Sequence, residues 1–170
     1  GMTCRTLLAL AACALTLPLA VPAAAAESGA RCTFSYFPQL SPGLSTTPGA
    51  GKVTSDLSTG KAECTGTLNG ANITGPGPFG FFGSYENGSC QSGGTGKGFI
   101  VAKIPTYTGE VNIKDPITFK FGPGSGFPPG AGDWDGEHTS GRYLVLPTKG
   151  DCVTSPVTEA KGQGIWEIRS

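Results

Sequence analysis

The sequence "KAECTGTLNGANIT", residues 61–74, places an Asn-Gly pair between two extended runs. Asn69-Gly70 is a strong short-range signal for a β-hairpin, because both central residues of a type I′ turn need positive φ angles, which Asn and Gly adopt most readily. The sequence "FGFFGSYENGSCQS", residues 79–92, repeats this arrangement at Asn87-Gly88. We therefore expect two consecutive hairpins in the middle of the chain.

Strand patterns recur on both sides of these hairpins. Residues 31–37, "RCTFSYF", alternate and place Cys32, Phe34 and Tyr36 on one face. Residues 98–104, "GFIVAKI", are apolar at successive positions, which predicts a strand covered on both faces. Further strands are expected in "EVNIKDPITFKF" (110–121), "GRYLVL" (141–146) and "CVTSPVTEAKGQGIWEI" (152–168).

The fold class follows from these strands and from the residues that separate them. In residues 110–121, Asp115-Pro116 interrupts the alternation, and Pro116 predicts an edge position or a bulge because proline donates no ladder hydrogen bond. Sustained helical spacing is missing after residue 26. About eight to ten short strands predict one all-β domain, an antiparallel β-barrel, with a β-sandwich as the alternative. The Gly- and Pro-rich segments 38–52 and 122–141 are expected to be long loops.

The first 26 residues have the pattern of a secretory signal peptide. One basic residue, Arg5, precedes an apolar run from Leu7 to Ala26, which ends in small residues suited to cleavage after Ala26. Gly1 precedes the initiator methionine and is set aside. An alternative is that "LAAC", ending at Cys13, is a lipoprotein acylation site. We expect a secreted or cell-envelope domain of residues 27–170 with no transmembrane segment.

Charge and cysteine content limit the partners and the environment. Without Arg5, the chain has 11 basic and 12 acidic residues, and this near-neutral balance argues against nucleic acid or an anionic membrane as partner. Four cysteines remain after residue 26, and an even number in an exported chain predicts disulfide bonds. The absence of a C-x-x-C pair argues against zinc.

Four cysteines allow three disulfide connectivities. Cys64 and Cys90 fall on the outer arms of adjacent predicted hairpins. Cys32 and Cys152 fall on strands near opposite chain ends, which become neighbours when a sheet closes on itself. We expect Cys64 to pair with Cys90 and Cys32 with Cys152, with the other two connectivities left open.

Three stretches carry a resemblance to a group of small exported proteins. They are "CTGTLNG" (64–70), "GSYENGSCQSGGTGKGFIVAKIPT" (83–106) and "PTKGDCVTSPVTEAKGQG" (147–164). They resemble four-cysteine all-β proteins of high-GC Gram-positive bacteria that have no assigned activity. The resemblance implies an exported all-β domain and assigns no functional residue.

The sequence "DWDGEH", residues 133–138, is the first candidate site. Asp133, Asp135 and Glu137 alternate like the ligands of a Ca²⁺ loop, but an EF-hand needs Gly at its sixth and Glu at its twelfth position, where His138 and Leu144 stand. A looser Ca²⁺ loop is one interpretation. The other is a turn at Asp135-Gly136 with solvated carboxylates.

His138 is the only histidine, so it is the candidate for catalysis in a small secreted hydrolase, with Asp133, Asp135 or Glu137 as its acidic partner. No G-x-S-x-G motif supports this role.

Aromatic residues give two candidate binding features. Phe79, Phe81 and Tyr85 share a strand face with Gly83, and they could contact an apolar ligand or a sugar ring; the alternative is ordinary core packing in which glycine makes room for a ring. Trp134 is expected at the tip of the long loop 122–141. We expect a disulfide-stabilised binding or structural domain rather than an enzyme, with an apolar small molecule, a glycan or a protein as its extracellular ligand and no required cofactor.

Overall fold

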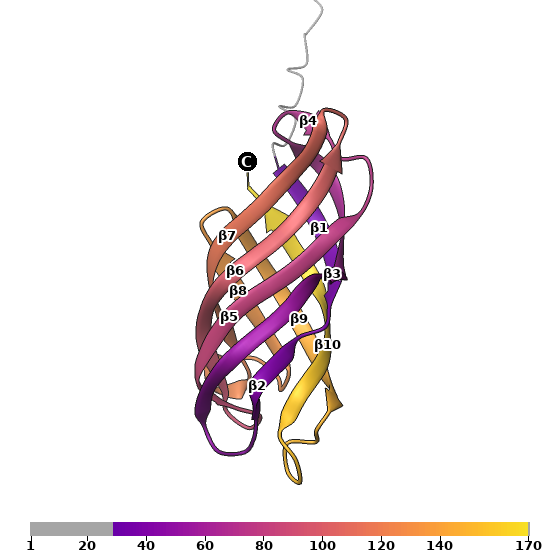
Figure 1. Ribbon diagram of the computed structural model, residues 1–170. Coiled ribbons are helices and arrows are strands. Elements are labelled where there is room, and N and C mark those ends of the chain that lie inside the picture. Colours follow the sequence, from indigo (N-terminus) through magenta and orange to yellow (C-terminus); the bar gives the residue numbers. More distant parts are fainter. Residues whose placement is uncertain (1–28, 170) are drawn as a thin grey trace, which may run out of the picture.

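The computed structural model describes residues 29–169, which form an all-β antiparallel barrel (Figure 1). The predicted signal peptide and the alternative acylation site at Cys13 lie outside the described residues. The strands are β1 (Gly29–Tyr36), β2 (Gln39–Leu44), β3 (Gly49–Leu68), β4 (Ala71–Asn72), β5 (Gly77–Ser89), β6 (Gly93–Thr106), β7 (Gly109–Phe121), β8 (Ala131–Gly136), β9 (Thr139–Lys149) and β10 (Val157–Ile168), with a short 3₁₀ turn, η1 (Pro123–Ser125), before β8.

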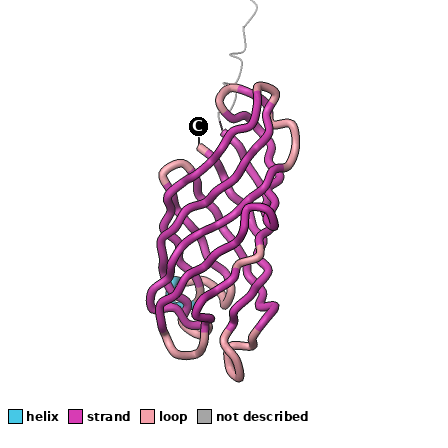
Figure 2. Tube along the Cα trace, in the orientation of Figure 1, coloured by secondary structure: helices cyan, strands magenta, loops and turns pink. Residues whose placement is uncertain are grey.

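Each wall strand pairs with its neighbours in the sequence, and the sheet closes where β1 pairs with both β10 and β3. β2 also lies between β10 and β3, so β1 and β2 together form one wall strand, with Phe37 and Pro38 between them. The barrel therefore has eight wall strands, and β4 adds a short hairpin to the end of β3. Figure 2 shows the strands running obliquely around the closed wall. The predicted barrel is confirmed, and the sandwich alternative is wrong.

The two ends of the barrel differ in the segments they contain. In the orientation of Figure 1, the upper end holds the start of β1, the end of β10 and the turn between β6 and β7. The lower end holds the β2–β3 turn and the β9–β10 loop. We use "upper" and "lower" in this sense below.

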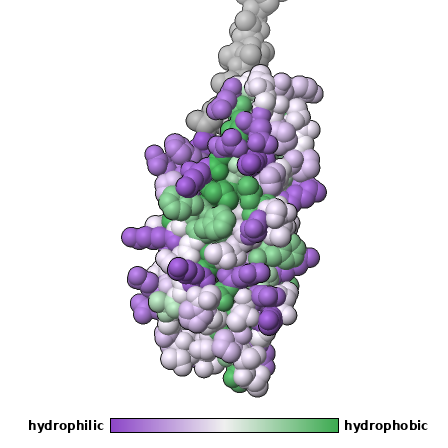
Figure 3. Space-filling model, in the orientation of Figure 1, coloured by the Kyte–Doolittle hydropathy of each residue, from purple (hydrophilic) through white to green (hydrophobic). Residues whose placement is uncertain are grey.

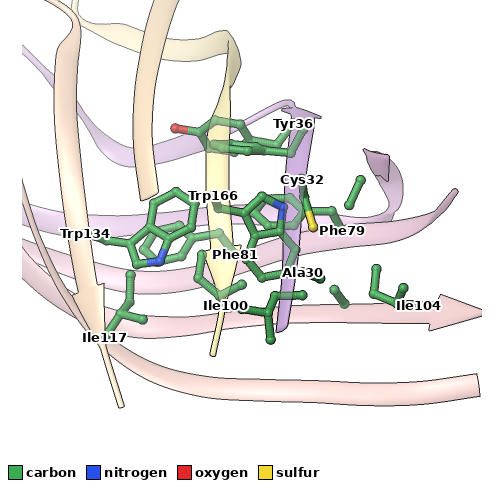
Figure 4. Packing of buried hydrophobic residues seen from close by; sticks show 14 of the residues in the cluster. Ala30, Cys32, Tyr36, Phe79, Phe81, Ile100, Ile104, Ile117, Trp134 and Trp166 are labelled. Atoms are coloured by element: carbon green, nitrogen blue, oxygen red, sulfur yellow. The ribbon is translucent and has the colours of Figure 1, made fainter. Parts of the chain in front are cut away.

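The interior is filled by alternate residues of every wall strand, most of them aromatic or aliphatic (Figure 4). Phe34, Phe79 and Trp134 pack in the middle of the barrel, with ring centroids 4.7 Å apart for Phe34–Phe79 and 5.3 Å for Phe34–Trp134. Trp166 meets Phe79 edge to face at 5.3 Å. These contacts hold the walls together in a dense aromatic layer.

Inward glycines lie beneath many of these rings. Each ring covers a glycine directly opposite it on the neighbouring strand, where a Cβ atom would overlap the aromatic side chain. The pairs are Phe34–Gly164, Tyr36–Gly162, Tyr85–Gly51, Phe119–Gly96, Trp134–Gly141 and Tyr143–Gly132. These glycines therefore make room for the inward aromatic rings, because any larger residue at the same position would prevent the ring from lying flat against the neighbouring strand.

The disulfides are Cys32–Cys64 and Cys90–Cys152, so the expected pairing is wrong. Cys32 and Cys64 are direct partners across β1 and β3, with Cα atoms 4.0 Å apart. Cys90, in the β5–β6 turn, reaches Cys152 in the β9–β10 loop at the lower end. The expected pairing failed because it treated Cys32 as a neighbour of the last strand only, whereas β1 also pairs with β3.

The two Asn-Gly pairs have different outcomes. Asn69 and Gly70 form the β3–β4 turn with φ angles of 51° and 77°, as expected. The second hairpin exists, but its turn is formed by residues 90–92. Asn87-Gly88 instead lies within β5, where the β5–β6 register shifts between Glu86 and Ser89. Asn87-Gly88 therefore forms a bulge, which interrupts the regular pairing of β5 with β6 while β5 continues to Ser89.

Both expected long loops contain strands. Segment 38–52 includes β2 and the start of β3, and segment 122–141 includes β8 and the start of β9. In β8 the pattern Gly-Asp-Trp-Asp alternates between interior and exterior, with Trp134 buried and Asp135 exposed. Glycine and aspartate are turn-forming residues, and they concealed this alternation.

Two expectations for β6 and β7 need correction. Residues 98–104 were expected to be covered on both faces, but only the inner face is covered: Ile100 is 2% exposed and Phe99 is 42% exposed. The alternation of β7 is not interrupted at Asp115-Pro116, because Asp115 takes an inward position and is 1% exposed. The β7–β8 ladder ends at Ile117, so the missing N–H of Pro116 falls just beyond it.

Candidate functional site

An internal cavity of about 290 Å³ lies between the central aromatic layer and the lower end of the barrel. Its upper boundary includes Phe34, Phe79, Phe81 and Trp134. Its lower walls come from the far ends of several strands, with contributions from Leu40, Leu44, Val53, Phe121, Val145 and Val157. Cys90 and Cys152 also line it, so the second disulfide helps to close the lower end.

The lining is apolar and uncharged. Among the residues that the structure describes, none that borders this cavity is Asp, Glu, Lys, Arg or His. Phe81 and Phe119 meet edge to face at 5.3 Å on one wall, and Ile100 and Ile117 complete that side. Such a lining favours neutral, apolar occupants, because an unpaired charge is costly to transfer from water.

The cavity reaches the surface beside the lower part of β9. Pro129, Leu146 and Pro147 line the cavity and are also exposed, with Leu146 61% exposed. These residues come from the segment before β8 and from the end of β9. The Val145 N–H donates to the Gly130 backbone oxygen at 2.8 Å, so these two segments are joined beside the opening.

A hydrogen-bonded chain holds Trp134 in the cavity wall. The indole Nε1 donates to the hydroxyl of Thr139 at 3.1 Å, and that hydroxyl donates to Asp115 Oδ2 at 2.6 Å. The other carboxylate oxygen accepts from the backbone N–H of His138 at 3.0 Å. Thr139 and Asp115 are buried, so this chain fixes the ring from the upper side of the layer.

Three tyrosine hydroxyls border the cavity. Tyr85 donates to the backbone oxygen of Pro42 at 2.5 Å, and Tyr143 donates to that of Lys120 at 2.9 Å. The Tyr36 hydroxyl makes no hydrogen bond with any residue in the range 29–169, although Tyr36 is only 8% exposed.

These hydroxyls stay protonated at physiological pH. Burial raises the pKa of Tyr36 and of Tyr85 above the ordinary value for tyrosine. Burial also raises the pKa of Tyr143, and the nearby charges of ionised Tyr36 and of Asp133 add to the effect. The polar atoms of this cavity are therefore neutral.

A second concave feature is a surface groove of about 920 Å³ on the outer wall. Phe82 and Phe99, opposite each other on β5 and β6, are 44% and 42% exposed and form an apolar side with Pro116. Gly83 and Gly98 form part of the floor. Ser84, Lys97, Thr118 and Asp135 provide a polar side. Figure 3 shows an apolar patch on this front wall surrounded by hydrophilic side chains.

A wider concave region of about 1470 Å³ is lined by residues from all eight wall strands, including the buried Trp134 and Trp166. Charges of both signs line it, including Arg31, Glu63, Lys120 and Glu167. It concentrates neither positive nor negative charge, so it offers no basic face of the kind that nucleic acid requires.

The sequence-predicted aromatic residues lie together in the barrel. Phe79, Phe81 and Tyr85 share the inward face of β5, and all three line the cavity, as does Trp134. The expected exposed position of Trp134 at a loop tip is wrong, since Trp134 is 4% exposed in β8. Whether these residues bind a ligand stays a prediction. The sequence analysis did not select Tyr36 or Tyr143 as site residues, although the alternation of residues 31–37 placed Tyr36 on the same face as Cys32 and Phe34.

The predicted metal and catalytic residues lie on the outside. Asp133 and Asp135 face outward from β8, and Glu137 and His138 form the turn to β9. His138 Nε2 lies 3.6 Å from Glu137 Oε1, with both side chains well exposed. Within the described part of the chain, no three His, Cys, Asp or Glu side chains come together closely enough to hold a metal ion. The structure therefore does not gather the three carboxylates into one ligand set.

Comparisons with known proteins assign no function to this chain, so a functional proposal depends on the barrel and its cavities. No protein-family model, curated protein sequence or solved structure matches this chain. Residues 29–169 contain no helix long and apolar enough to cross a membrane. The chain is thus a disulfide-stabilised eight-strand β-barrel domain, and its two disulfides indicate an oxidising environment.

Proposed function

We propose that this domain is an exported carrier or sensor that binds a small apolar molecule inside the barrel. The observation that supports the proposal is the apolar, uncharged cavity of about 290 Å³. Its size is near the lower end of the range for small-molecule sites, which starts at about 300 Å³. The signal-peptide pattern of residues 1–26 supports export.

The cavity volume sets the size of the ligand. An engineered apolar cavity of about 150 Å³ admits benzene, so a cavity about twice as large suits a molecule of roughly ten to twelve non-hydrogen atoms. At roughly 0.5 kcal/mol per non-hydrogen atom, such a molecule would bind with a Kd on the order of 100 µM or somewhat below. A substituted single ring, such as p-cymene, has the appropriate size and polarity.

A binding experiment with p-cymene tests the proposal. Two neighbouring positions on β10 provide matched variants: Ala160 is buried and lines the cavity, whereas Lys161 is exposed. We expect p-cymene to shift the NMR signals of cavity residues saturably in the wild-type protein and in Lys161→Leu. Ala160→Leu should lose this binding because the larger side chain occupies the cavity.

The result can also be read from tryptophan fluorescence, since Trp134 borders the cavity. Undiminished binding by Ala160→Leu would show that p-cymene binds elsewhere. No saturable binding of p-cymene or of other neutral molecules of this size would contradict the proposal.

The outer groove favours a second candidate function, recognition of a neutral glycan. The exposed rings of Phe82 and Phe99 offer an apolar surface to the C–H face of a sugar, and the facing side offers Ser84 and Lys97 to its hydroxyl groups. Both a cation, Lys97, and an anion, Asp135, border the groove, which suits uncharged hydroxyls better than a charged polymer.

Retention on insoluble polysaccharides tests this second function. The double variant Phe82→Ala/Phe99→Ala should lose retention, whereas Tyr107→Ala should keep it, since Tyr107 is 79% exposed on the turn at the upper end. Equal retention of the two variants, or no retention of the wild-type protein on any polysaccharide, would contradict glycan binding in the groove.

A further inference from the structure

The polar groups that border the cavity differ in whether they already have hydrogen-bond partners. The Trp134 indole, the Tyr85 hydroxyl and the Tyr143 hydroxyl all donate to protein atoms. The Ser89 hydroxyl lies 2.6 Å from that of Ser92 and also accepts from the Ser92 N–H. The donors of Trp134, Tyr85 and Tyr143 are therefore used within the protein, and the Ser89 hydroxyl has Ser92 as its partner.

Tyr36 is different. It lies at the end of β1, and its ring covers Gly162 on β10 and packs 5.5 Å from Phe34 and 6.2 Å from Phe79, measured between centroids. These contacts fix the ring in the cavity wall. The hydroxyl at its free end makes no hydrogen bond within residues 29–169, while 92% of the residue surface is buried. Among residues 29–169 the fully buried polar side-chain atoms without a partner are Thr158 Oγ1 and Trp166 Nε1, so the Tyr36 hydroxyl is not sealed off by the protein, and its donor is free for an occupant of the cavity that supplies an acceptor.

Tyr143 adds an acceptor on the same side of the barrel. Its hydroxyl donates its proton to the backbone oxygen of Lys120, which leaves the lone pairs of the phenol oxygen free to accept. Tyr36 and Tyr143 both line the cavity, and both lie beside β10, where Tyr36 is opposite Gly162 and Tyr143 is opposite Gly164. One donor and one acceptor are thus offered at the edge of an otherwise apolar space.

From this arrangement, and on the basis of the proposed function, we infer that the Tyr36 hydroxyl donates a hydrogen bond to a neutral oxygen of the ligand. The cavity then selects small apolar alcohols, phenols or ketones over hydrocarbons of the same shape. It also rejects carboxylates and ammonium ions, because no described side chain in the lining carries an opposite charge.

Three ligands with one carbon skeleton test the inference: p-cymene, its phenol carvacrol, and 4-isopropylbenzoate. Affinities are measured by calorimetry for the wild-type protein and for Tyr36→Phe, which removes only the hydroxyl. Tyr107→Phe is the matched control, because it makes the same change on a residue that is 79% exposed and does not border the cavity.

The wild-type protein and Tyr107→Phe should bind carvacrol about tenfold more tightly than p-cymene, the effect of one net hydrogen bond. Tyr36→Phe should bind p-cymene as the wild-type protein does and should lose most of the preference for carvacrol. The benzoate should bind all three proteins more weakly than p-cymene does.

Each other outcome has a definite meaning. Equal binding of p-cymene and carvacrol by the wild-type protein would overturn the role of Tyr36 and leave the apolar cavity site intact. A carvacrol preference that persists in Tyr36→Phe would do the same. Tight binding of the benzoate would overturn the selection for neutral ligands. Failure of the wild-type protein to bind any of the three would refute the proposed function itself.

Discussion

Replacing Thr139 with valine is expected to lower the free energy of unfolding by about 3 kcal/mol. The Thr139 hydroxyl, in a residue with no exposed surface, links the Trp134 indole N–H to the Asp115 carboxylate. Valine has nearly the same shape but removes both hydrogen bonds, one of them to a charged group, and leaves a buried N–H without a partner. Each loss is worth about 1–3 kcal/mol.

For a domain of this length, the unfolding entropy is about 0.3 kcal/mol/K, so the melting temperature should fall by about 10 °C. Urea denaturation followed by tryptophan fluorescence gives the change in free energy, and the Nε1 proton signal of Trp134 reports the lost bond directly. Thr139→Ser is the control: it keeps the hydroxyl and should cost only about 1 kcal/mol for the deleted methyl group. If valine proves no more destabilising than serine, the hydroxyl does not support the cavity wall as argued.

Three further expectations concern packing, pH and catalysis. Gly141→Ala should destabilise the barrel by about 1–3 kcal/mol, because the new Cβ would overlap the Trp134 indole. Gly49→Ala is the control and should be nearly neutral, since no atom lies within 4 Å of the new Cβ. Equal denaturation midpoints for the two variants would mean that the Trp134 ring moves aside without cost. Hydrogen bonds from the Thr154 hydroxyl and from neighbouring backbone N–H groups lower the pKa of Asp151 to about 2. The stabilisation that these bonds give to the β9–β10 loop is therefore present above about pH 4 and is lost as the pH falls through about 2. NMR titration of the loop amides should give a midpoint near 2, and a midpoint near 4 would exclude these bonds in solution. His138→Ala should leave every activity found in a hydrolase screen unchanged, and an activity abolished by this change would establish the hydrolase alternative.

The parts of the fold that the sequence predicted depend on local signals. Asn69-Gly70 forms its turn because two adjacent residues meet the φ requirement alone. The alternation in β1 correctly placed Phe34 and Tyr36 on one face, and that in β5 placed Phe79 and Phe81 on one face, since side-chain direction along a strand has a period of two; in the structure both faces point inward. Repeated signals of this kind were enough to predict an all-β barrel.

The errors arise where structure depends on partners distant in the sequence. β8 looked like a loop because its identity as a strand depends on β7 and β9, and one of its two glycines, Gly132, is explained by its contacts with Lys120 of β7 and with the Tyr143 ring of β9. The pairing of Cys32 with Cys64 requires the register of β1 against β3, which no local pattern contains. The lower walls of the cavity could not be predicted for the same reason, because they combine residues of β2, β3, β7, β9 and β10.

The rings that cover glycines also bear on how the barrel closes. The two chain ends meet at the seam between β1 and β10, and no turn connects these strands to determine which residues face each other. Phe34 over Gly164 and Tyr36 over Gly162 mark that alignment, because a shift by one residue would place each ring against a neighbouring side chain instead. The alignment of this seam thus depends on two residues that carry no side-chain carbon, and substitutions at Gly162 or Gly164 should favour barrels that fail to close between β1 and β10 and expose strand edges to other copies.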